Sequence, residues 1–117
     1  MESAARFSRQ GINSQGERGT LMDFILLMHA KPAVVTADSD WQAYFERLGA
    51  AGVMRGGSMI GDGACFSQTQ SPPEPTAHLD GYIRIETVDF ETARSFLAGN
   101  PVYEAGGVVE IRELPRD

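Results

Sequence analysis

The chain has 117 residues and a mass of 12.7 kDa, which is enough for one domain with a core of ordinary size and too little for two. No apolar segment approaches the roughly 20 residues that span a membrane, and the single cysteine excludes a scaffold of internal disulfides. The net charge of −6 disfavours binding to phosphate backbones. We therefore expect a soluble, cytoplasmic protein that binds neither membranes nor nucleic acids.

Residues 1–21 differ in composition from the rest of the chain. They are rich in Ser, Gln, Gly and Arg, and their apolar residues follow neither a helical nor a strand period. Such a segment buries too little apolar surface to offset the entropy cost of ordering it. We expect a disordered leader over residues 1–21 and one folded domain over residues 22–117, with a leader that docks on a partner subunit as the alternative.

The folded part begins with the pattern of a strand followed by a helix. Phe24–Met28 is continuously apolar, which is typical of a strand buried on both faces. Ser39 and Gln42 have the spacing of a capping box, with Ser39 as the N-cap. A helix is then expected up to Gly52, because four apolar side chains recur at helical spacing: Trp41, Tyr44, Phe45 and Leu48.

A hairpin and a proline-rich loop are predicted next. Residues 53–60 read as a strand weakened by two glycines, and the Gly-Asp-Gly sequence at 61–63 is typical of a tight turn. We expect a short strand over Ala64–Gln68 to return from that turn. Residues 70–78 contain three prolines, which predicts an extended loop.

The last part of the chain repeats the strand, helix, strand order. Residues 81–86 alternate in polarity, Asp89 is placed to cap a helix that ends at residues 99–101, and Val108–Leu114 reads as the final strand. The predicted order βαββαβ is typical of a ferredoxin-like α+β fold, in which two helices cover one face of a four-stranded antiparallel sheet.

This fold leaves one face of the sheet without helices. Because the first strand is apolar on both faces, we expect a second copy of the chain to cover the other face and form a homodimer. Tyr82, Arg84 and Glu86 share the polar face of their strand. They either line a cleft at the interface or meet solvent.

Three segments in order carry a family pattern. They are MDFILLMHA at 22–30, FERLGAAGVMRGGSMI at 45–60 and AGNPVYEAGGVVEIREL at 98–114. Together they resemble the YCII-related family, including its DGPF-type branch, of the dimeric α/β-barrel superfamily. The resemblance covers residues 22–114 and implies a ferredoxin-like subunit, a dimer and a cleft near the dimer interface.

The resemblance also implies a proposed catalytic dyad, which this chain does not keep. In the YCII branch a His in the first helix and an Asp at an Asp-Pro turn form the dyad, and a His–carboxylate pair suits acid–base work near neutral pH. Here the two positions hold Asp40 and Asn100. The DGPF signature is also missing, since residues 75–81 read PTAHLDG.

Other residues are candidates for a substitute site. His29 ends the first strand and, if Asp40 lies near it, the two form an acid–base pair. His78 and Asp80 project the same way from an extended chain. The alternative is that these side chains are solvated. A metal bound by His29, His78 and Asp80 is disfavoured, because their spacing matches no ligand motif.

At the terminal turn Asn100 and Tyr103 are placed to hydrogen-bond a small polar ligand, although Asn before Pro is equally an ordinary helix cap. The glycine pairs lack the Gly-Lys-Ser/Thr of a phosphate loop, and we expect no cofactor. Two functions stay open: a homodimeric module that binds a small polar organic ligand in a cleft near the interface, or a cofactor-independent lyase or isomerase. Whether the protein is an enzyme is left undecided.

Overall fold

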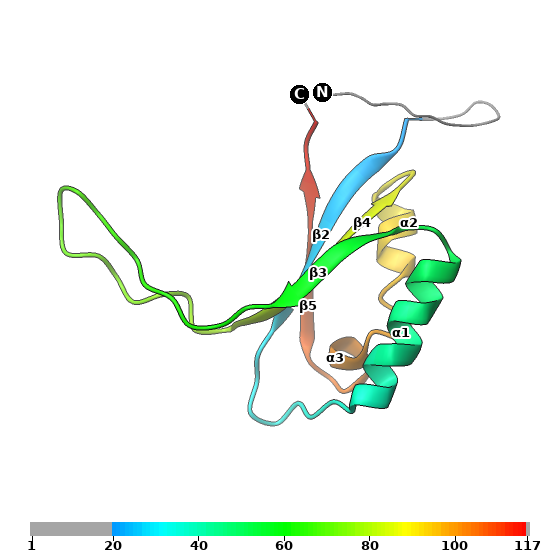
Figure 1. The fold of residues 1–117 in the computed structure, drawn as a ribbon, viewed down its shortest axis with the longest axis horizontal. Helices are drawn as coiled ribbons and strands as arrows, with labels where there is room; N and C mark the ends of the chain where they lie inside the picture. The colour runs from blue at the N-terminus through cyan, green and yellow to red at the C-terminus, as the bar shows by residue number, and fades with distance from the viewer. Residues whose placement is uncertain (1–19, 117) are drawn as a thin grey trace.

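The structure is a computed structural model that describes residues 20–116. The leader expected over residues 1–21 lies outside the described residues, apart from its last two. The described chain folds into strands and helices in the following order (Figure 1): β2 (Met22–His29), α1 (Asp38–Ala50), β3 (Met54–Met59), β4 (Leu79–Thr87), α2 (Phe90–Ser95), α3 (Pro101–Glu104) and β5 (Val108–Leu114). None of the helices in residues 20–116 is long and apolar enough to cross a membrane.

The four strands form one antiparallel sheet in the order β3-β4-β2-β5. Strand β2 lies inside the sheet and pairs with β4 on one side and with β5 on the other. This order, with helices between the strands, is the predicted ferredoxin-like α+β fold. The final strand has the predicted bounds, Val108–Leu114.

The alternation of β2 separates the two faces of the sheet. Phe24, Leu26 and Met28 are at most 4% exposed and lie in the core with Tyr44 and Leu48 of α1. The residues between them are only half-buried: Asp23, Ile25, Leu27 and His29. The helices therefore cover one face, and no element of the described chain covers the other, which we call the uncovered face.

The capping box predicted at the start of the first helix is wrong. Helix α1 begins at Asp38, its N-cap Ala37 makes no side-chain cap, and Ser39 lies inside the first turn. Gln42 donates to the Glu46 side chain at 3.4 Å instead. Two acidic residues in the first turn replace the cap, because they interact favourably with the helix dipole. Gly52 adopts φ +74° after the helix, as its predicted role requires.

The returning strand predicted over Ala64–Gln68 is also wrong. Residues 60–78 contain no strand and project away from the body as a long loop (Figure 1). Strand β4 begins at Leu79 and pairs with β3 itself. Residues 64–68 have no apolar face to bury, since Phe66 is their one large apolar side chain and is 91% exposed.

The turn expected to end the second helix is itself the start of a further helix. Helix α2 is capped by Asp89, whose side chain accepts from the Thr92 N–H at 2.7 Å as predicted, but it ends at Ser95. Asn100 is then the N-cap of α3, and Pro101 is its first residue. Proline is favoured there because its missing N–H has no partner in the first turn.

Candidate functional site: a cleft between α1 and α3

A cleft of about 490 Å³ opens between α1 and α3 in the helical layer. Its size lies in the range of small-molecule sites, about 300–1,000 Å³. From α1 the residues Asp40, Tyr44 and Arg47 face it, because a spacing of four and three places them on one side of a helix. The opposite wall comes from Gly99, Pro101, Glu104 and Ala105, and the segment before α1 adds Val35 and Thr36.

Tyr44 fixes the floor of the cleft. Its ring is 2% exposed, and its hydroxyl donates to the Phe96 carbonyl at 2.7 Å. Burial raises the pKa of the phenol, and this outweighs the lowering by a hydrogen bond with Asn100 and by the charge of Arg47. Tyr44 is therefore a neutral, already partnered group that shapes the cleft.

Arg47 is also occupied by contacts within the chain. Its guanidinium donates to the carbonyl of Ala98 and, at 3.5 Å, to that of Ser95. It lies 5.3 Å from the ring centroid of Phe96. Two of its five N–H donors thus serve the carbonyls that follow α2, and the guanidinium also lines the cleft.

Asn100 is fully buried beside the cleft and does not present its amide to it. Its Oδ1 accepts from the N–H of Val102 at 3.0 Å and of Tyr103 at 3.1 Å, and its Nδ2 lies 4.0 Å from Met28 Sδ. The predicted ligand-binding role gives way here to the cap, which was the alternative interpretation. Tyr103 itself is half exposed and lies outside the cleft lining.

Two carboxylates remain available in the cleft. Glu104 accepts from the Gly99 N–H through Oε2 at 2.9 Å, and its Oε1 makes no hydrogen bond within residues 20–116. Asp40 makes no side-chain hydrogen bond or ion pair with any residue in the described part of the chain. Two carboxylates with open acceptor positions thus line the cleft, beside the Thr36 hydroxyl, which accepts from Trp41 Nε1 at 3.0 Å.

The two histidines meet elsewhere, on the uncovered face of the sheet. His29 Nε2 lies 3.0 Å from Glu110 Oε1, and the rings of His29 and His78 are edge to face with centroids 4.7 Å apart. Arg112 donates to Glu110 Oε2 at 2.9 Å. Hydrogen bonds from Arg112 and then from His29 lower the pKa of the Glu110 carboxyl.

The structure thus divides the predicted site residues between two places. Among residues 20–116 no hydrogen bond or ion pair joins His29 to Asp40, and the carboxylate that reaches His29 is Glu110. Sequence reasoning missed Glu110. The alternation of the last strand was visible, but the register that sets Glu110 opposite Leu27 was not.

Asp80 joins neither place. It is exposed near the start of β4, where its carbonyl accepts from the Ile60 N–H at 2.9 Å. Within the described chain, no group of three or more His, Cys, Asp or Glu side chains is arranged to hold a metal ion.

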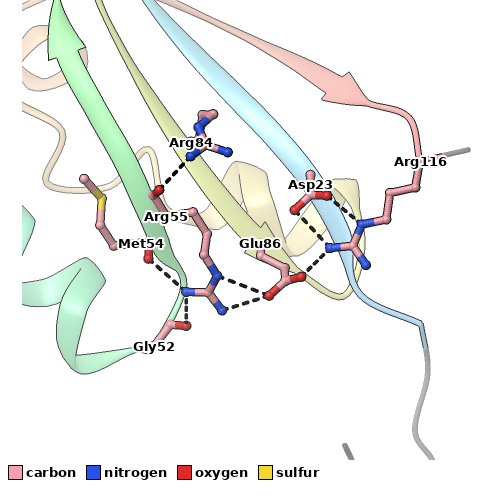
Figure 2. Close-up of polar contacts among 7 residues, drawn as sticks. All are labelled: Asp23, Gly52, Met54, Arg55, Arg84, Glu86 and Arg116. Carbon is pink, nitrogen blue, oxygen red and sulfur yellow. Dashed lines mark hydrogen bonds and ion pairs between the residues drawn. The ribbon is translucent and has the colours of Figure 1, made fainter. Parts of the chain in front are cut away.

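A network of charged side chains lies on the uncovered face at the opposite end of β2 from His29 (Figure 2). Glu86 is its centre: Oε1 accepts from Arg55 at 2.8 and 3.2 Å, and Oε2 accepts from Arg116. Arg116 also binds Asp23 through two hydrogen bonds of 2.6 and 3.0 Å, which raise the pKa of its guanidinium above the ordinary value. Every carboxylate of this network is paired, so it ties the chain end to β2 and β4 rather than offering a site.

Glu86 makes part of the stability dependent on pH. Burial alone would raise its pKa, but hydrogen bonds and charges from Arg55 and Arg116 outweigh burial and lower the pKa below the ordinary 4.5. In the unfolded chain Glu86 takes up its proton at a higher pH than in the folded chain. The stabilisation by ionised Glu86 is therefore present above about pH 4.5 and is lost as pH falls through the folded pKa. We expect wild type to lose more unfolding free energy on acidification than Glu86→Gln.

Urea unfolding between about pH 6 and pH 3 measures this difference. Glu91→Gln is the matched control, because Glu91 is 78% exposed and lies 3.6 Å from a single arginine. If Glu86→Gln loses as much unfolding free energy on acidification as wild type does, the network does not stabilise the fold through ionised Glu86.

Comparison with family models and with curated proteins finds no match to this chain. Among solved structures, the chain is similar to 5-chloro-2-hydroxyhydroquinone dehydrochlorinase from Burkholderia phenoliruptrix AC1100 in complex with 2,5-dihydroxybenzoquinone. The TM-score is 0.50 over 82% of this chain and 96% of that chain, with 17% sequence identity. At this identity the likeness supports the ferredoxin-like α+β fold alone.

Proposed function

We propose that the protein is a YCII-like homodimer of the dimeric α/β-barrel superfamily that binds a small polar organic molecule in the cleft between α1 and α3. The observation that carries the proposal is the Asp40 carboxylate. It lines a cleft of ligand size and has no partner in the described chain. A ligand that donates hydrogen bonds to it therefore gains a charge-assisted contact without breaking an existing one.

The lining also favours one class of ligand. Asp40 and Glu104 Oε1, which make no hydrogen bond within residues 20–116, are open to accept hydrogen bonds, whereas the guanidinium of Arg47 already donates to two backbone carbonyls. Apolar side chains of Val35, Pro101 and Ala105 complete the wall. These features favour a molecule with an apolar body and an ammonium or hydroxyl group, and they disfavour a carboxylate.

The resemblance to the YCII-related family supports the same location. The two positions of the family dyad correspond here to Asp40, which lines the cleft, and to Asn100, whose neighbours Gly99 and Pro101 line it. Among the described residues that line this cleft there is no histidine, the side chain best suited to proton transfer near neutral pH, so binding fits it better than proton transfer.

The homodimer is supported by the uncovered face. Half-buried Ile25 and Leu27 lie there among paired charges of both signs, so two such faces can stack without bringing an excess of like charge together. Because the cleft lies in the helical layer, such stacking leaves the cleft open. The group on the uncovered face that contains His29, His78 and Glu110 is then the one that lies near the interface.

Two ligands of one shape and opposite charge test the proposal. Tyramine and its carboxylate counterpart phloretate are titrated into the ¹⁵N-labelled protein, and amide shifts are recorded. We expect tyramine to shift amides around the cleft at millimolar concentration and phloretate to bind at least about tenfold more weakly. Asp40→Asn removes this preference, whereas Asp38→Asn, on the same helical turn, keeps it. Equal binding of both ligands contradicts the proposed ligand class.

A second candidate is an acid–base lyase or isomerase. The observation that favours it is the His29–Glu110 pair at 3.0 Å, since a carboxylate that bonds one ring nitrogen fixes the orientation and tautomer of the imidazole. The structural neighbour is named a dehydrochlorinase. In the same titration, ligand shifts centred on the His29 end of the uncovered face, rather than on the cleft, support this candidate.

A further inference from the structure

The loop between β3 and β4, residues 60–78, is a projecting arm. Figure 1 shows it leaving the sheet and extending beyond every other element. Phe66 on the arm is 91% exposed, and Met59 at its base is 81% exposed. The Phe66 ring therefore buries almost none of its apolar surface against residues 20–116, and it is available to be buried by another surface.

The charges of the arm complement those of the uncovered face. The arm carries Asp62 and Glu74 and has no lysine or arginine. The uncovered face presents Arg84 and Arg112, both exposed, of which Arg112 already donates to Glu110 at 2.9 Å. Arg84 donates to the Arg55 carbonyl but has no carboxylate partner in residues 20–116. Prolines 72, 73 and 75 restrict the arm in the free chain, which lowers the entropy cost of docking.

We propose that the arm of each chain docks on a second copy of the chain, with Phe66 as its apolar anchor and its carboxylates toward the arginines of that copy's uncovered face. This inference rests on the homodimer proposed above. Because Arg84 and Arg112 lie beside Ile25 in the sheet, the docked arm takes the place of part of the facing sheet, and it supplies a large share of the association energy.

Sedimentation equilibrium of three proteins tests the assignment. We expect Phe66→Ala to raise the dimer dissociation constant at least about tenfold, as loss of an aromatic anchor does. Phe45→Ala, the same change at a half-exposed residue of α1, is expected to change it less than about threefold. Thermal unfolding of both variants checks that each is folded.

The native Cys65, next to the anchor, reports docking separately. Its rate of modification by a maleimide should fall in wild type as protein concentration rises through the dimer dissociation constant, and should stay constant in Phe66→Ala over that range. If Phe66→Ala changes neither the dimer dissociation constant nor the modification rate of Cys65, the proposed docking of the arm is wrong, and the proposed homodimer is unaffected. A wild-type protein that stays monomeric overturns both.

Discussion

Replacing Phe24 by alanine is expected to lower the free energy of unfolding by about 3–5 kcal/mol, the largest effect of a single substitution that we predict. Phe24 is 0% exposed at the centre of the sheet, and its ring meets that of Phe90 edge to face with centroids 5.9 Å apart. Truncation removes the buried area and leaves a cavity that β2, held by strands on both sides, cannot close.

Urea unfolding at one protein concentration measures this loss, because the stability of an associating protein depends on concentration. Phe45→Ala is the matched control: its ring is 41% exposed and stacks on Trp41, so less than half of the loss is expected. Equal losses in the two variants contradict the core described here.

Asn100→Ala is expected to lower the free energy of unfolding by about 2–3 kcal/mol. The side chain is fully buried, and its loss leaves the N–H groups of Val102 and Tyr103 without their acceptor. Because Gly99 and Pro101 line the cleft, the same change also weakens binding in the tyramine titration.

Asn100→Asp tests whether the loss of stability in Asn100→Ala comes from the missing cap hydrogen bonds, because aspartate has nearly the same volume as asparagine. The carboxylate keeps both acceptor contacts and lies at a helix start, where negative charge is favourable, and these gains offset part of the cost of placing a charge in a fully buried position. We expect it to lose less than half of what alanine loses. A loss of under about 0.5 kcal/mol in Asn100→Ala contradicts the cap.

The order of the elements was predictable because each rests on a local pattern. The alternation in residues 81–86, the Asp89 cap and the final strand Val108–Leu114 need only neighbouring residues, and the structure confirms them. The prediction of a capping box at Ser39 was wrong because acidic residues in the first turn stabilise the start of the helix without a side-chain cap. The prediction of a strand over Ala64–Gln68 was wrong because the turn pattern at 61–63 does not determine which segment pairs with β3.

The site was less predictable, since it depends on contacts between distant residues. Asp40 and the turn around Asn100 are 60 positions apart in sequence, and only the resemblance to a known family placed them together. The His29–Glu110 pair depends on the register between β2 and β5. That register is set by packing across the sheet, which a single sequence does not display.

A crystal structure of the protein soaked with tyramine tests the central claim most directly. The account predicts electron density for the ligand between α1 and α3, with its ammonium group within about 3.2 Å of an Asp40 carboxylate oxygen. Ligand density confined to the uncovered face beside His29 and Glu110, with the α1–α3 cleft empty, contradicts it.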